Sequence, residues 1–343
     1  MRLPILAFAA VVAAAAPAAA TFHDVTISPI PFDRWMYPFN GTPATRNLAS
    51  TFSAVYADPD SFDNKDATLI LAVNTVAAGI PAGQGAANYL PVAVRVRVTH
   101  FEGEFLYDPT YDAWQTYLDP GDPNYVADSD PGRPIELYGV GLRNGYTLPL
   151  VVGASGPAGP PGFGEGERYC ESSCGGLGQG IRNAFPYDPG AADPQGDVSN
   201  NVRRRPPLTG GSFDPFPWAL GISTSGLNPG DPVPQGVFNT SPGETFEFDV
   251  ELSDPDVLAY VRQGLNVGVL AFAITSMHTV EQQVGGTNPN FYNRESTDTG
   301  AIKPSMEIVA VVPEPGFAAG LASSVGALAL LDRRRARRAR AQS

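Results

Sequence analysis

The chain has 343 residues, a formal net charge of −13 at pH 7, two cysteines and three histidines. A surface this acidic repels phosphate backbones, so the composition argues against nucleic acid as a partner and favours divalent cations or neutral glycans. Glycine and proline are frequent, with 37 and 34 residues, but stay below the share that is typical of disordered chains. We therefore expect a folded body with long loops.

Residues 1–20 have the composition of a secretory signal peptide. Arg2 supplies a positive charge, residues 3–16 are apolar and rich in alanine, and residues 18–20 are a run of alanines. A small-residue run of this kind is typical of a signal-peptide cleavage site. We expect export through the inner membrane, cleavage before Thr21, and a mature body of residues 21–312.

An aspartate-rich loop precedes the first long apolar segment, residues 67–75. Calcium takes six to eight hard oxygen ligands, and this loop offers several of them close together in sequence. The spacing is not that of an EF-hand loop, so two interpretations stay open: a structural Ca²⁺ site, or solvated turn residues ahead of a strand. The predicted calcium ligands are Asp58, Asp60, Asp63 and Asp66.

Strand patterns recur through the body. Residues 93–101 alternate between apolar side chains and polar ones such as Arg95 and Arg97, which is typical of a half-buried strand. Turn signals such as Asn144-Gly145 separate the segments. The other predicted strands are residues 67–75, 134–142, 147–152, 218–223, 245–252, 266–276 and 306–312.

One helix is expected among these strands. Asp254 followed by Pro255 is a typical N-cap with proline at the first helical position, and Gly264 is expected to end the helix. Many strands with a single helix predict an all-β fold. We expect an antiparallel, jelly-roll-like sandwich over residues 21–312, with long loops rich in glycine and proline.

Residues 101–125 interleave aromatic and acidic side chains. Aromatic faces beside carboxylates suit a sugar, which stacks its apolar face on a ring and donates its hydroxyls to the acceptors. The other interpretation is that most of these rings are core residues. The predicted glycan-stacking residues are Tyr107, Tyr111 and Trp114, and the acidic side chains among them include Asp108 and Asp112.

Residues 153–215 contain few strand patterns, and we predict a long loop or insertion there. Cys170 and Cys174 lie in this segment, and in an exported protein such a close pair is expected to form a local disulfide. A zinc site would need further ligands, and the three histidines lie far away in sequence.

Catalytic motifs are weak in this chain. No G-x-S-x-G turn joins a strand to a helix, and the nearest phosphate-loop candidate, residues 139–145, has the wrong spacing. Glu102 and Glu104 form a conceivable glycosidase pair, but any alternating strand brings such neighbours to one face. We expect a non-catalytic protein, and a surface-displayed polysaccharide hydrolase is the alternative.

Residues 313–343 have three parts in order. Pro313-Glu314-Pro315 is followed by an apolar run, residues 317–331, and by an arginine-rich end. As a helix the apolar run would be about 22 Å long, shorter than the hydrocarbon core of about 30 Å, which suits a transient membrane stop. Positive charge would hold the end on the cytoplasmic side. The arginines are Arg333, Arg334, Arg335, Arg337, Arg338 and Arg340.

This tail resembles the PEP-CTERM sorting signal, which exosortases read in Gram-negative bacteria that secrete exopolysaccharide. The resemblance implies that an exosortase-type enzyme processes the motif at residues 313–315, that the hydrophobic helix at 317–331 inserts transiently, and that the protein reaches the cell surface or extracellular matrix. Residues 34–46, with the segment from Ala67 onward, also resemble the openings of carbohydrate-binding-like β-sandwich domains. Together the resemblances imply a structural or adhesive protein associated with exopolysaccharide.

Overall fold

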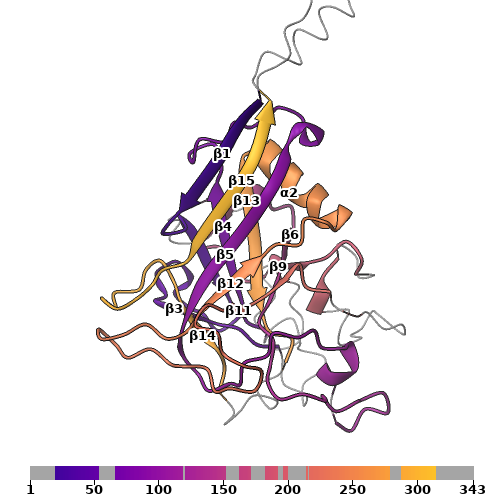
Figure 1. Cartoon of the computed structure of the whole chain (residues 1–343), viewed down its shortest axis with the longest axis vertical. Helices are drawn as coiled ribbons and strands as arrows, with labels where there is room; N and C mark the ends of the chain where they lie inside the picture. Colours follow the sequence, from indigo (N-terminus) through magenta and orange to yellow (C-terminus); the bar gives the residue numbers. More distant parts are fainter. Residues whose placement is uncertain are drawn as a thin grey trace, which may run out of the picture.

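The computed structural model describes residues 20–53, 66–118, 120–151, 162–170, 182–191, 196–199, 214, 216–278 and 287–313. Antiparallel strands dominate this part of the chain and form two large sheets (Figure 1). A separate small sheet pairs β7 (Thr147–Val151) with β8 (Gly162–Gly164) in parallel.

The first sheet places the two ends of the described body beside each other. β1 (Ala20–Ile27) pairs with β15 (Ser305–Pro313), so that Ala20 lies opposite Pro313. Figure 1 shows β1, β15 and β5 side by side along the length of the molecule. The further strands of this sheet are β5 (Leu90–Glu102), β12 (Thr245–Asp249), β11 (Ile222–Ser223), β14 (Asn290–Tyr292) and β3 (Leu48–Ser50).

The second sheet is covered on both faces. Every residue of β13, the apolar run VLAFAIT, is buried. One face of this sheet contributes to the core between the sheets, and the other packs against Phe163, Tyr169 and Cys170. In order, its strands are β10 (Ala219–Leu220), β6 (Glu136–Leu142), β13 (Val269–Thr275), β4 (Thr68–Asn74) and β2 (Phe32–Met36), and β9 (Ala184–Tyr187) also pairs with β6.

Side-chain alternation along β5 builds the core between the two sheets. Val94, Val96 and Val98 are buried, whereas Arg95 and Arg97 form ion pairs with carboxylates of neighbouring strands on the outer face. The half-buried strand predicted at residues 93–101 is therefore confirmed. The same core includes residues of the second sheet, among them Leu69, Leu71, Leu270, Phe272 and Ile274.

Eight strands form the paths of the two sheets when the edge strands β11 and β2 are left aside. In chain order they are β1, β4, β5, β6, β10, β12, β13 and β15. The first sheet contains β1, β15, β5 and β12 side by side, which are the first, eighth, third and sixth of the eight. The second sheet contains β10, β6, β13 and β4 side by side, which are the fifth, fourth, seventh and second. The predicted antiparallel β class is thus present, with the first and last strands adjacent.

The helix begins as predicted but ends later. α2 (Pro255–Val267) is capped by Asp254, whose carboxylate accepts hydrogen bonds from two backbone N–H groups of the first turn. The predicted end at Gly264 is wrong. Gly264 lies inside the helix, where a Cβ would approach Leu270 Cδ1 to 2.9 Å. Gly268, in the left-handed conformation with a φ of 85°, ends the helix instead.

Three other predictions of secondary structure need correction. The strand predicted at residues 266–276 begins only at Val269, because α2 continues to Val267. Residues 218–223 are split between the sheets, because β10 pairs with β6 and β11 pairs with β12. Gly221 lies at the crossing, where a Cβ would stand 3.0 Å from the Phe248 ring. The predicted loop at residues 153–215 also contains β8 and β9.

A buried ion network ties the segment after residue 181 to the second sheet. The Arg182 guanidinium lies 3.0 Å from an Asp66 carboxylate oxygen and 2.7 Å from one of Asp197. Arg143 reaches the other Asp197 oxygen at 2.9 Å. All four side chains are at most 5% exposed.

Candidate functional site

A surface groove of about 410 Å³ lies beside the first turn of α2. Aromatic and acidic side chains line it, and none of its described lining residues is a lysine or arginine. The aromatic lining residues are Phe216 and Trp218, and the acidic ones are Asp188, Asp214, Glu251, Asp254 and Asp256.

Phe216 provides an aromatic platform in this groove. Its side chain is 67% exposed, although a large apolar ring usually gains free energy by burial. The ring is stacked on Tyr111, with centroids 4.7 Å apart and planes at 3°. One face of Phe216 is therefore fixed against Tyr111, while much of the side chain stays open to solvent.

The carboxylates of the groove are held in place by hydrogen bonds. Asp188 accepts from Trp218 Nε1 at 3.0 Å and from the Gly190 N–H at 2.7 Å. Asp214 accepts from the Trp114 N–H at 3.1 Å. Burial raises the pKa of Asp188, although these two hydrogen bonds oppose the rise. A carboxylate has about four lone-pair positions, so each group retains capacity for donors from a ligand.

The predicted stacking residues have different environments. Tyr107 and Trp114 are 4% and 6% exposed, so neither presents a ring face to solvent. The Tyr107 hydroxyl accepts from the Ser223 N–H at 3.1 Å inside the core. Tyr111 is not itself a lining residue of the groove, but its ring stacks on Phe216, which is.

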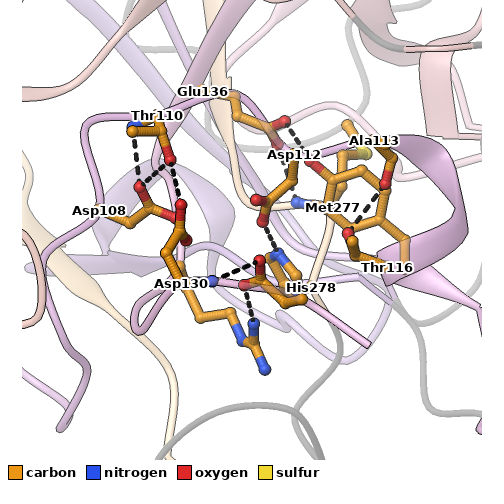
Figure 2. Close-up of polar contacts among 12 residues, drawn as sticks. Asp108, Thr110, Asp112, Ala113, Thr116, Asp130, Glu136, Met277 and His278 are labelled. Carbon is orange, nitrogen blue, oxygen red and sulfur yellow. Dashed lines mark hydrogen bonds and ion pairs between the residues drawn. The ribbon is translucent and has the colours of Figure 1, made fainter. Parts of the chain in front are cut away.

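A second feature, a cluster of four aspartates, lies in the loops between β5 and β6 (Figure 2). One carboxylate oxygen from each of Asp108, Asp112, Asp128 and Asp130 lies within 4.8 Å of the others. Thr110 connects two of them, because its hydroxyl lies 2.6 Å from Asp108 Oδ1 and 3.1 Å from Asp130 Oδ2. Figure 2 shows Thr110 in contact with both Asp108 and Asp130, and the Asp112 carboxylate facing His278.

A glycine permits the two loops to approach. Gly132 has a φ of 130°, and a Cβ there would stand 2.7 Å from Asp108 Cβ and 2.9 Å from the Tyr107 carbonyl oxygen. Tyr107 also forms a parallel β-bridge with Arg133. Backbone pairing next to a residue without a side chain therefore brings residues 108–112 against residues 128–130.

Burial and mutual repulsion perturb these carboxylates. Burial, with repulsion from Asp112 and Asp130 added, raises the pKa of Asp108 to about 6. Burial and Asp130 raise the pKa of Asp112 to about 6, and burial and Asp112 raise that of Asp128. The cluster therefore favours any partner that reduces its negative charge.

Behind the cluster lies a buried carboxylate, Glu136. It accepts hydrogen bonds from the Met277 N–H at 2.9 Å and from Tyr117 at 3.1 Å, and burial raises its pKa to about 8. His278 follows Met277 in the chain, and its Nε2 lies 2.6 Å from Asp112 Oδ2. Glu136 is 1% exposed, so it holds neighbouring side chains in place and presents no surface to a substrate.

The remaining predicted residues are placed only in part. Asp66 is held by Arg182, and Asp58, Asp60 and Asp63 lie outside the described residues. Cys170 is in a disulfide, and its predicted partner Cys174 lies outside them too. Pro313 ends β15, whereas Glu314, Pro315 and the apolar run 317–331 are likewise not described. Within the described part of the chain, no helix has the length and apolar character needed to cross a membrane.

Sequence reasoning missed Phe216, Asp128 and Asp130. Asp128-Ser129-Asp130 carries two oxygen ligands at a short spacing, which is a usable signal for a cation site. Phe216 has no local signal, because its partner Tyr111 is distant in sequence.

Comparisons with protein-family models, curated protein sequences and solved structures found no match for this chain.

Proposed function

We propose that the chain is an exported, envelope-sorted protein with a structural or adhesive role, which binds the neutral sugars of an exopolysaccharide without cleaving them. The observation that carries the proposal is the groove, where the Phe216 ring, backed by Tyr111, stands beside fixed carboxylates. Sugars present apolar C–H faces for stacking and many hydroxyl donors, which match such a lining.

The charge of the groove narrows the sugar class. Its described lining carries five acidic side chains and no basic one, so an anionic sugar would be repelled. A cationic peptide would also be attracted by the carboxylates. The resemblance of the tail to a signal of exopolysaccharide-secreting bacteria favours the sugar.

The strand order supports a jelly-roll-like sandwich as the framework. A jelly roll distributes eight strands over two sheets through two Greek-key connections, with the first and last strands as neighbours. The order of β1, β15, β5 and β12 in one sheet and of β10, β6, β13 and β4 in the other agrees with that pattern.

Removal of the Phe216 ring is expected to weaken sugar binding. Phe216→Ala should raise the dissociation constant for a neutral oligosaccharide about tenfold, since a lost stacking contact of about 1.4 kcal/mol corresponds to that factor. Isothermal titration of the chain with a panel of neutral and anionic oligosaccharides measures this change.

A matched control is Phe238→Ala, because Phe238 is 58% exposed and does not line the groove. This variant should bind as the unchanged chain does. Equal binding by the Phe216→Ala variant, or binding of oligolysine in preference to every sugar, would contradict the proposal. Release of new reducing ends from the sugars would favour the hydrolase alternative.

Sorting has its own test. If Pro313-Glu314-Pro315 is processed, the intact mass of protein recovered from the envelope should lack the arginine-rich end. The pairing of Ala20 with Pro313 supports a body that ends at this motif. A variant with Pro313→Ala and Pro315→Ala should retain the end. Recovery of Arg340 on the unchanged surface protein would refute sorting.

A further inference from the structure

The aspartate cluster concentrates more negative charge than its neighbours in the described part of the chain offset. Four carboxylates converge, and among the described residues the cationic or ionisable side chains that pair with them are Arg133, 3.0 Å from Asp128, and His278, 2.6 Å from Asp112. Charges this close repel strongly where burial lowers the local dielectric constant. A divalent cation between the carboxylates would attract each of them and so offset their mutual repulsion.

Asp108 supplies an independent indication of a ligand. Its side chain is 2% exposed, and Oδ2 has no hydrogen-bond partner among the described residues. The other oxygen accepts from the Thr110 N–H at 2.7 Å, which fixes the orientation of the carboxylate. A buried carboxylate oxygen without a partner is costly, so its presence in the cluster indicates a site for a cation.

We propose that Asp108, Asp112, Asp128 and Asp130 bind one calcium ion. The site offers oxygen atoms from loops, which is the ligand type and irregular setting that Ca²⁺ accepts. Zinc sites usually include nitrogen or sulfur ligands, and the histidine in contact is paired with Asp112. A pocket of about 270 Å³ is lined by Asp128 and Asp130 of the cluster and by Arg133.

This site differs from the calcium loop predicted at residues 58–66. Asp66 pairs with Arg182, and neither residue belongs to the aspartate cluster. The inference is also independent of sugar binding, because it depends on the aspartates alone.

Calcium is expected to stabilise the full chain. With a dissociation constant of about 10⁻⁴ M, 1 mM calcium chloride would raise the folding equilibrium constant about elevenfold over a chelated sample. Thermal melting with calcium or EDTA measures the shift, and titration calorimetry gives the stoichiometry. The Asp130→Asn variant should lose most of the rise in melting temperature that calcium causes. In EDTA it should melt no lower than the unchanged chain, because one of the mutually repelling charges has been removed. Asp108→Asn should behave in the same way.

Two controls locate the site. Asp24→Asn, on the exposed face of β1, should keep the full calcium shift. A variant with Asp60→Asn and Asp63→Asn should also keep it, and loss of the shift there would move calcium to the predicted loop and refute this assignment. The assignment is also refuted if the unchanged chain melts identically in calcium and EDTA, or if Asp130→Asn keeps the full shift.

Discussion

Replacement of Arg182 by methionine is expected to destabilise the folded chain by about 3–5 kcal/mol, the usual cost of removing one partner from a buried ion pair. Arg182 is 1% exposed and contacts both Asp66 and Asp197. In the variant the Asp66 carboxylate would lose its guanidinium while still buried, whereas Asp197 would keep Arg143. Chemical denaturation measures the free energy of unfolding.

The control for this prediction is Arg95→Met. The Arg95 side chain is 34% exposed and pairs with Asp249 and Glu307 on the outer face of the first sheet. Exposed pairs contribute about 0–1 kcal/mol, so this variant should remain within about 1 kcal/mol of the unchanged chain. A similar small loss for Arg182→Met would show that the buried network contributes little to stability.

A second large effect is expected at the end of β5. Gly103 has a φ of 99°, and a Cβ there would stand 1.8 Å from the Asn288 carbonyl oxygen. Gly103→Ala should therefore destabilise the fold by about 3 kcal/mol or more, since a left-handed conformation and a clash with backbone both contribute. The melting temperature should fall, and sugar binding with it, because Tyr111 follows in this segment.

Gly79 allows the two contributions to be separated. It has a φ of 91°, and a Cβ at this position would meet no other atom within 4 Å. Gly79→Ala should cost only the conformational part, about 1–2 kcal/mol. Equal losses of stability in the two variants would mean that the chain moves the Asn288 carbonyl away from the added Cβ at residue 103 without cost.

Local sequence patterns correctly predicted elements that show a regular alternation of residues or a recognisable helix cap. The valines of β5 alternate because one face of the strand packs into the core, and Asp254 begins α2 because its carboxylate caps the first turn. The helix end was mistaken because two glycines were available. Gly264 serves packing against Leu270, and only the structure shows that Gly268 adopts the left-handed conformation.

The candidate sites were largely beyond sequence reasoning because tertiary contacts assemble them. Tyr111 was predicted as a stacking residue, but its partner Phe216 comes from a distant segment. Asp108 and Asp112 were noted as sugar acceptors, and their approach to Asp130 depends on the close contact at Gly132. Neither proximity has a signature in residue spacing.

The pairing of Ala20 with Pro313 determines how the molecule would carry mechanical load. β15 runs between β1 and β5 and ends at Pro313, so a chain held by its C-terminal end is pulled along the axis of β15. Hydrogen bonds of an antiparallel ladder lie perpendicular to the strands. Tension between that end and a ligand held elsewhere on the body would therefore load the bonds to both neighbouring strands together, in shear, and would not open them one by one as in unzipping.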